Sequence, residues 1–171
     1  PLHPGDQLDH YRIDSLVARS GMASIFRGTD MRNGRQVAIK VPHPEVESDP
    51  ALFDRFKREE EIGKMLDHPG VMKVYVDDER SQVYMVMEWV EGRLLRKILD
   101  EKHKLPIEQA IRLTVRILDA LGYIHDRGVA HRDLKPENVM VADDDTIKLI
   151  DFGIAASAKS KRLTFAKLSQ T

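Results

Sequence analysis

The spacing of apolar residues changes near residue 50, and this change constrains the fold more than any other feature of the chain. Residues 11–41 are rich in β-branched and aromatic side chains and contain two turn signals, Ser20-Gly21 and Asn33-Gly34. An Asn-Gly pair between two such runs is typical of a tight hairpin. The segment therefore predicts three consecutive antiparallel strands. Residues 42–50 hold three prolines and three acids, which predicts a loop.

The next segment has helical spacing. Beyond Ala51, large apolar residues recur on one helical face until His68-Pro69-Gly70, which predicts a single helix. Residues 71–76 and 82–90 then have the composition of two further strands, separated by an acidic turn. Residues 1–90 are therefore expected to form a five-stranded antiparallel sheet with one helix.

The second half of the chain is mainly helical. Residues 94–99 predict a short helix, and an apolar stripe from Pro106 to Arg127 predicts a long one. Short β-branched runs at 139–141 and 147–150 flank an Asp-rich turn and predict two strands. We therefore expect an α+β fold with two units, residues 1–90 and residues 91–171.

Composition narrows the classes of function. The 27 basic and 28 acidic residues nearly cancel, so a strongly basic nucleic-acid-binding protein is not expected. The chain has no cysteine, which excludes disulfides, cysteine-ligated metals and thiol catalysis. No stretch approaches the roughly 18 apolar residues of a membrane span. We expect a cytoplasmic chain without a membrane segment.

Three short motifs carry the chemistry. Residues 131–138 are His-Arg-Asp-Leu-Lys-Pro-Glu-Asn, residues 151–153 are Asp-Phe-Gly, and residues 37–40 are Val-Ala-Ile-Lys on an expected strand. Any one of them can occur by chance, but all three in this order and context do not. The chain resembles the eukaryotic-like Ser/Thr protein kinases, in particular their bacterial branch, from about Tyr11 past Asp151. The resemblance implies a two-lobed kinase fold, with ATP in the cleft between the lobes.

The resemblance also implies a role for each polar residue of the motifs. Asp133 would orient the substrate hydroxyl and accept its proton, and Lys135 would neutralise the transferring phosphoryl group. Asn138 and Asp151 would be oxygen ligands of Mg²⁺. Lys40 would pair with the α- and β-phosphates of ATP. The alternative for the loop residues is that Asp and Asn merely favour turns.

Lys40 needs a carboxylate partner, and the matching position on the expected helix is Glu59. Glu60 and Glu61 are adjacent, so the alignment could be wrong by one residue. Consecutive helical residues point about 100° apart, and only one of the three glutamates can face the site. The alternative for this run of charge is an ordinary solvated helix face.

A nucleotide pocket is implied as well. It would have a roof over the adenine ring, a floor, a back wall and a hinge that offers backbone groups. The roof corresponds to Val17, Ile25 and Ala38, and the floor to Met140. The back wall corresponds to Met87, and the hinge to Glu88 and Val90.

The chain departs from the family in its glycine-rich loop. Ala18, Ser20 and Ala23 replace the three signature glycines, and only the additional Gly21 is left. Alanine and serine add little bulk but lose easy access to positive φ. The backbone N–H groups of Ala18, Ser20 and Gly21 can still face the phosphates of ATP. We expect this loop to be stiffer, or to close less tightly over the nucleotide, than in the family.

The last 20 residues hold four bases and no acid. In the resembled family this place is the activation loop, where a phosphate can order the segment by pairing with an arginine such as Arg132. We expect the chain to be the front part of a kinase domain, poorly stable alone because its long helix would expose apolar surface. The candidate phosphate acceptors are Ser157, Ser160, Thr164, Ser169 and Thr171.

Two other functions stay open. The altered glycine loop favours a pseudokinase-like nucleotide-binding or scaffolding module. A small-molecule phosphotransferase is the weaker alternative, because Lys135 matches the pattern of kinases that act on protein Ser/Thr. The expected partners are ATP and proteins that offer Ser or Thr hydroxyls, with dimerisation or autophosphorylation as further options and no nucleic acid.

The altered loop generates a first prediction. ATP should bind more weakly than is ordinary for the family, because the loop closes less tightly over the phosphates. A calorimetric titration with ATP measures this directly, and an affinity ordinary for the family would remove the hypothesis.

Overall fold

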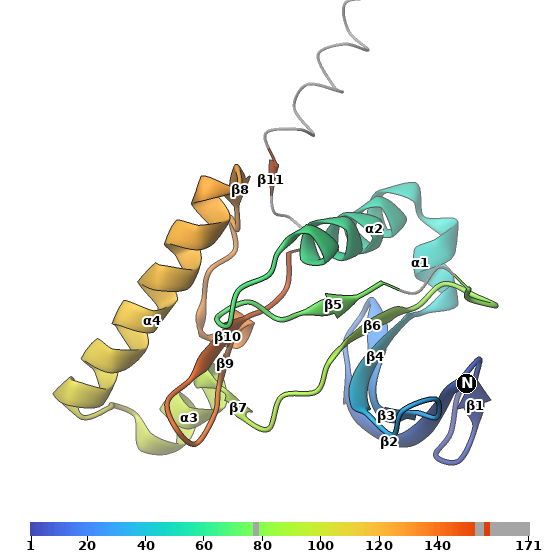
Figure 1. Cartoon of the computed structure of the whole chain (residues 1–171), viewed down its shortest axis with the longest axis horizontal. Helices are drawn as coiled ribbons and strands as arrows, with labels where there is room; N and C mark the ends of the chain where they lie inside the picture. Colours follow the sequence, from blue (N-terminus) through green and yellow to red (C-terminus); the bar gives the residue numbers. More distant parts are fainter. Residues whose placement is uncertain (77–78, 153–155, 158–171) are drawn as a thin grey trace, which may run out of the picture.

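A curled antiparallel sheet occupies the first half of the protein (Figure 1). The structure is a computed structural model that describes residues 1–76, 79–152 and 156–157. The strand order is β1-β2-β3-β4-β6-β5. The six strands are β1 (Gln7–Leu8), β2 (Tyr11–Arg19), β3 (Ala23–Asp30), β4 (Gln36–Pro42), β5 (Val74–Tyr75) and β6 (Met85–Glu88). The five expected strands are confirmed, and the two-residue β1 is added at the edge.

Side chains that alternate between two apolar clusters explain why these segments form a sheet. Ile13 of β2, Phe26 of β3 and Ile39 of β4 belong to one cluster, while the adjacent Ile25 and Ala38 contribute to a second one. The β3–β4 connection contains Gly34 with φ of +72°, a backbone conformation that glycine adopts at low cost. The expected hairpin at Asn33-Gly34 is thereby confirmed.

The expected loop at residues 42–50 is wrong in part, because it contains the short helix α1 (Pro44–Ser48). Pro44 lies in the first turn, where a missing N–H costs no hydrogen bond, and Val46 is buried. Asp49 then caps the next helix, because its Oδ1 accepts the N–H of Ala51 at 2.9 Å. Prolines that suggested a loop therefore begin two successive helices.

Helix α2 (Pro50–Met65) lies against the sheet through a close approach at one glycine. A Cβ on Gly63 would collide with the side chain of Val74 in β5. Phe56 and Ile62 of the same helix are both buried, each in a different apolar cluster. Contact at this short range is possible only because residue 63 has no side chain.

Among its described residues, the second half contains two α-helices and two small sheets. Strands β10, β9 and β7 pair antiparallel, and β11 pairs with β8. Figure 1 places α4 on the far side of the β7-β9-β10 sheet from the six-stranded sheet. The elements are β7 (Arg93–Leu94), α3 (Leu95–Lys102), α4 (Ile107–Asp126), β8 (Val129–Ala130), the 3₁₀ helix η1 (Pro136–Asn138), β9 (Val139–Val141), β10 (Ile147–Leu149) and β11 (Ala156–Ser157).

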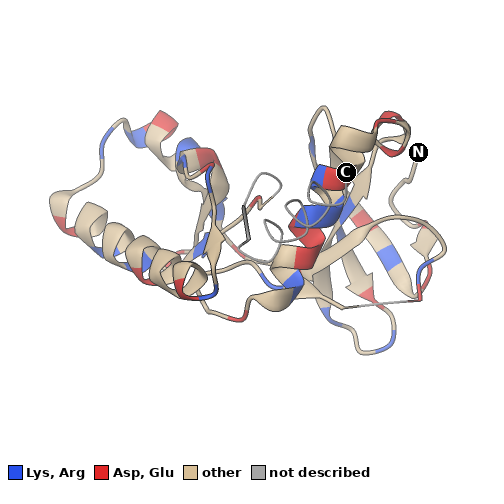
Figure 2. Ribbon diagram, turned by 90° about the horizontal axis from the view of Figure 1, so that it is seen from above, with Lys and Arg blue, Asp and Glu red and all other residues tan. Residues whose placement is uncertain are grey.

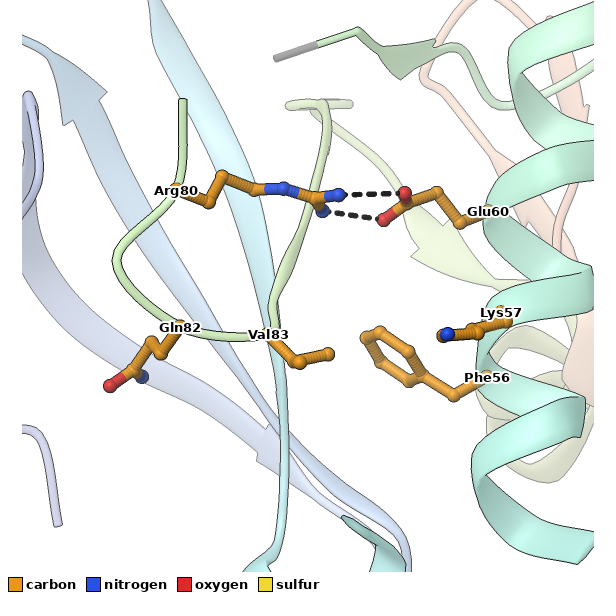
Figure 3. A pocket seen from close by; sticks show the side chains of 6 residues that line it. All are labelled: Phe56, Lys57, Glu60, Arg80, Gln82 and Val83. Atoms are coloured by element: carbon orange, nitrogen blue, oxygen red, sulfur yellow. Dashed lines mark hydrogen bonds and ion pairs between the residues drawn. The ribbon is translucent and has the colours of Figure 1, made fainter. Parts of the chain in front are cut away.

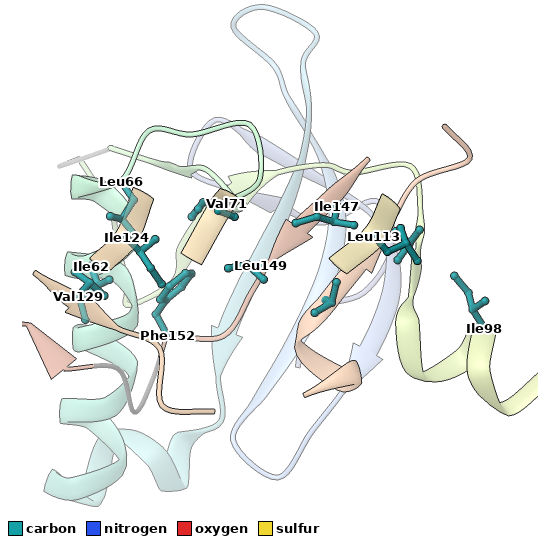
Figure 4. Packing of buried hydrophobic residues seen from close by; sticks show 13 residues of the cluster. Ile62, Leu66, Val71, Ile98, Leu113, Ile124, Val129, Ile147, Leu149 and Phe152 are labelled. Carbon is teal, nitrogen blue, oxygen red and sulfur yellow. The ribbon is translucent and has the colours of Figure 1, made fainter. Parts of the chain in front are cut away.

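One apolar cluster joins the two halves. Ile62 of α2 and Leu66 directly after it pack in the same core as Ile124 of α4, Leu149 of β10 and Phe152 (Figure 4). The backbone adds to this connection, because Leu149 donates its N–H to the Gly70 carbonyl at 2.8 Å and accepts from Met72 at 3.0 Å. The segment that leads to Asp151 is therefore fixed to the end of α2.

Helix α4 carries a stripe of exposed apolar side chains, as expected from the sequence. Ile107, Ile111, Val115 and Leu118 are each more than half exposed, and their spacing places them on one helix face. The opposite face supplies Leu113, Ala120 and Ile124 to the core. Within the described ranges, no helix is both long and apolar enough to cross a membrane.

This stripe generates a prediction about association. The double variant Val115→Lys/Leu118→Glu should reduce the concentration-dependent light scattering of the purified chain, because it breaks a continuous apolar patch. Its melting temperature should change by less than about 2 °C, since exposed substitutions cost little. Leu113→Glu, on the buried face of the same helix, should unfold the chain. Unchanged scattering of the double variant would contradict the prediction.

Candidate active site

Lys40 and Glu59 form a shielded ion pair between the sheet and α2. Lys40 lies in β4, in register with Ile25 on one side and Met85 on the other. Its Nζ donates to Glu59 Oε2 at 2.6 Å, and both side chains are less than one-fifth exposed. Of the three consecutive glutamates, Glu59 is thus the one that reaches Lys40. The sequence had left that choice among Glu59, Glu60 and Glu61.

The electrostatics of Glu59 place a third charge nearby. Burial raises the pKa of the Glu59 carboxyl, because it disfavours the charged form. The Lys40 ammonium opposes that rise, and the negative charge of Asp151 adds to it. Lys40 and Asp151 therefore both act on the Glu59 carboxyl, although they lie far apart in the sequence.

His131 connects the loop of residues 131–138 to the segment that carries Asp151. Its Nδ1 accepts the backbone N–H of Asp133 at 3.2 Å, so Nε2 carries the proton and donates to the Ile150 carbonyl at 2.7 Å. The imidazole is buried and lies 4.9 Å from the ring of Phe152. These contacts indicate a structural role for His131.

Asp133 is held in place by two side chains of its own loop. Asn138 Nδ2 donates to the Asp133 carbonyl at 2.8 Å and to its Oδ2 at 3.2 Å. Lys135 Nζ lies 3.5 Å from Asp133 Oδ1. The carboxylate is about one-third exposed. An oriented carboxylate that solvent and substrate can reach suits a proton acceptor.

Two residues of this region adopt a left-handed backbone conformation, as Asp9, His103 and Asp145 do elsewhere. Arg132 and Asp151 have φ of +65° and +60°, in the left-handed region that non-glycine residues seldom adopt. Such conformations persist where surrounding contacts impose them, and they cluster at functional sites. Here the contacts of His131 and Phe152 supply that constraint.

The donor set of Asn138 and Asp151 fits a magnesium ion. Because the Asn138 amide nitrogen donates to Asp133, its oxygen is the atom that can serve a cation. Together with the Asp151 carboxylate it offers hard oxygen donors, and Mg²⁺ in nucleotide sites takes its other ligands from water and phosphates. Within residues 1–76 and 79–152, no cluster of three or more His, Asp or Glu side chains offers a self-sufficient metal site.

The residues assigned to the adenine pocket come from the six-stranded sheet, the segment after β6 and the β7-β9-β10 sheet. Ala38 and Met87 are buried in one cluster with Ile25 packed against it, and Val17 is half exposed. Met140 of β9 is half buried. Val90 follows β6 closely in the chain and is half buried.

Glu88 has a contact that the sequence did not reveal. Its Oε1 accepts from Lys148 Nζ of β10 and from the Lys73 backbone N–H, each at 2.9 Å. The side chain therefore links the six-stranded sheet to the β10 strand that precedes Asp151. A lysine in a short strand carried no distinctive signal, because its partner is 60 residues away.

The altered glycine loop is closed by Ser20. Its Oγ accepts from the backbone N–H groups of Met22 at 3.2 Å and Ala23 at 3.1 Å, and its own N–H donates to the Ala23 carbonyl. Neither Ala18, Ser20 nor Ala23 has a positive φ. The replacements are therefore unstrained, and the serine hydroxyl occupies two amides of the loop.

Comparison with known proteins extends this description. The profile of the protein kinase domain matches residues 11–170. A probable serine/threonine-protein kinase of Streptomyces coelicolor is 38% identical over 162 residues, and the probable serine/threonine-protein kinase PknB of Lactococcus lactis is 39% identical over 158. These alignments cover 92% and 91% of this chain but 24% and 25% of the relatives.

A solved structure has the same fold. The kinase domain of PknI from Mycobacterium tuberculosis, crystallised as a mutant, superposes with a TM-score of 0.73 at 28% identity. The match covers 91% of this chain and 64% of that one. The expected α+β kinase-like fold is thereby confirmed. The chain, which spans about a quarter of the curated relatives described above, belongs to the protein kinase domain family.

Proposed function

We propose that the chain is the ATP-binding and catalytic part of a serine/threonine protein kinase. It would transfer the γ-phosphoryl group of ATP to Ser or Thr hydroxyls of protein substrates, with Mg²⁺. The observation that carries the proposal is the 2.6 Å Lys40–Glu59 pair, which holds an ammonium within the electrostatic reach of Asp151. We further propose that residues 1–90 form the nucleotide-binding lobe and residues 91–171 part of the other lobe.

Each residue would act on a different part of the reaction. Lys40 binds the α- and β-phosphates, and Glu59 keeps its ammonium directed at them. Asn138 and Asp151 hold Mg²⁺, which when bound offsets the negative charge of the phosphates. The pocket of Ile25, Ala38 and Met87 takes the adenine ring.

Asp133 would act on the incoming hydroxyl. The hydroxyl oxygen forms a bond to the γ-phosphorus while the bond from that phosphorus to the bridging oxygen of ADP breaks, and the hydroxyl proton passes to Asp133. Lys135, at 3.5 Å from the same carboxylate, is close enough to neutralise the transferring group.

Regulation by phosphorylation is part of the proposal. Ser157 lies in β11, whose backbone pairs with β8, and the other candidate acceptors Ser160, Thr164, Ser169 and Thr171 lie outside the described residues. A phosphate on this basic segment would find an arginine at Arg132, beside the catalytic Asp133. Autophosphorylation within a dimer is one route to it.

One observation favours the alternative of a nucleotide-binding or scaffolding module. The Ser20 hydroxyl occupies the amides of Met22 and Ala23, two groups that a phosphate-binding loop would direct at ATP. A protein with this loop can bind nucleotide weakly and transfer phosphate slowly.

Asp133→Asn separates the two functions. In the kinase, the variant should lower phosphate incorporation from labelled ATP and Mg²⁺ into a Ser/Thr protein substrate by about a hundredfold or more, because the proton acceptor is lost. ATP affinity should be unchanged, since Asn138 still donates to the backbone carbonyl of residue 133. Equal incorporation by the variant and the unsubstituted chain would rule out the kinase function for this chain.

Ser20→Gly tests the loop. We expect the ATP dissociation constant to fall by about fivefold, because freeing two backbone amides recovers roughly one hydrogen bond's net free energy. Ser20→Ala is the matched control: it also removes the hydroxyl but adds no backbone freedom. A similar gain in both variants assigns the effect to the hydroxyl, and no gain in either contradicts the prediction.

A further inference from the structure

Two adjacent glutamates of α2 bind cations on different sides of the helix. Glu59 faces the sheet and pairs with Lys40. Glu60, about 100° further around the helix, binds Lys64 at 2.9 Å and Arg80. Figure 2 shows both basic and acidic residues along this helix. The orientation that holds Glu60 on its partners therefore also sets where Glu59 points.

Arg80 forms a bidentate ion pair with Glu60 through both terminal nitrogens of its guanidinium. Its Nη1 lies 2.7 Å from Glu60 Oε2 and its Nη2 lies 3.0 Å from Oε1. The two side chains are only 24% and 14% exposed. Although burial raises the pKa of Glu60, the hydrogen bonds from Arg80 and Lys64 outweigh it and hold that pKa below its ordinary value. The contact is thus a bidentate pair of fully charged groups.

The segment that carries Arg80 is itself anchored to the sheet. The guanidinium also donates to the Tyr84 carbonyl. The Tyr84 hydroxyl donates to Asp9 Oδ2 at 2.6 Å, and the Ser81 N–H donates to the same oxygen at 3.0 Å. Tyr84 is fully buried. Arg80 therefore ties α2 to a rigid part of the protein.

A pocket lies beside the contact between Arg80 and Glu60. A pocket of about 380 Å³ separates the outer side of α2 from the segment before β6. In Figure 3 Phe56 and Val83 face each other across it, and the Arg80–Glu60 pair bridges the gap above them. Phe56 and Val83 pack in one apolar cluster, so dispersion contacts fix part of the distance between α2 and this segment. Beside the pocket, the Arg80–Glu60 ion pair adds a directional polar contact to that packing.

We propose that Arg80 is a positioning residue for nucleotide binding: by holding Glu60, it keeps α2 in the orientation in which Glu59 meets Lys40. Arg80 touches neither ATP nor the reacting atoms and acts through the helix. The proposal rests on the proposed function, because it assigns the Lys40–Glu59 pair to the phosphates. It adds a residue from outside the three sequence motifs.

The first test measures ATP affinity. Arg80→Met keeps much of the side-chain length and removes the charge, so α2 should spend less time in the binding orientation and the dissociation constant should rise about fivefold. Arg80→Lys, which keeps the charge but not the two-pronged contact, should recover part of the affinity. Arg112→Met is the matched control, because Arg112 pairs with Asp145 far from α2. An affinity loss equal in Arg80→Met and Arg112→Met would overturn the proposal.

A double-variant cycle separates positioning from general stabilisation. If Arg80 acts through Glu59, then Arg80→Met should change ATP affinity little in a Glu59→Gln background, because the pair it serves is already weakened. The melting temperatures should still fall additively. Additive losses of affinity would instead show that Arg80 acts by another route, and would refute the inference.

A nucleotide-free measurement keeps this inference distinct from the proposed function. The chain has no cysteine, so Glu61→Cys on α2 and Met31→Cys in the turn directly after β3, both exposed, accept a pair of spin labels. The distance distribution between the labels should be narrow with Arg80 present and broad with Arg80→Met. An unchanged distribution would refute the role of Arg80. A broadened distribution in a chain that binds no ATP would support the positioning role of Arg80 and reject the proposed nucleotide site.

Discussion

The buried ion pair between Lys40 and Glu59 is the interaction on which the arrangement of the site depends. Removing two charged groups from water costs free energy unless they lie close enough for their attraction to offset that cost. At 2.6 Å the pair meets that condition, but only while α2 lies against β4. The close contact of Gly63 with Val74 and the burial of Ile62 provide this placement. The packing of α2 against the sheet and the formation of the Lys40–Glu59 ion pair therefore depend on each other.

A second set of contacts connects the sheet and α2 to the other half of the protein. Leu149 joins the segment after α2 through backbone hydrogen bonds, and Lys148 reaches Glu88 from the same strand. Shortly after β10 comes Asp151, whose neighbour Phe152 packs on His131. The carboxylates of Asp133 and Asp151 are consequently held by the same core that holds α2. The motif residues Lys40, Glu59, Asp133 and Asp151 are thus held by the six-stranded sheet, α2 and the loops around β9 and β10.

Local chemistry explains which parts of the fold were predictable. The strands of the hairpins and the helices α2, α3 and α4 follow from apolar spacing and from turns such as Asn33-Gly34, because both depend on neighbours within a few residues. The segment 42–50 was misjudged, since Pro44 and Pro50 fit a helix start as well as a loop. Burial of Val46 decides between them, and burial depends on the rest of the chain.

The sequence by itself determined the family and the residues of its motifs, because their order and spacing are written along the chain. Only the tertiary structure decided which glutamate meets Lys40, that Ser20 closes its own loop, and that Arg80 holds the outer side of α2. Arg80 lies 20 residues from Glu60, and Lys148 lies 60 residues from Glu88. Contacts at such separations depend on how the elements pack in space, and no local pattern of residues encodes them.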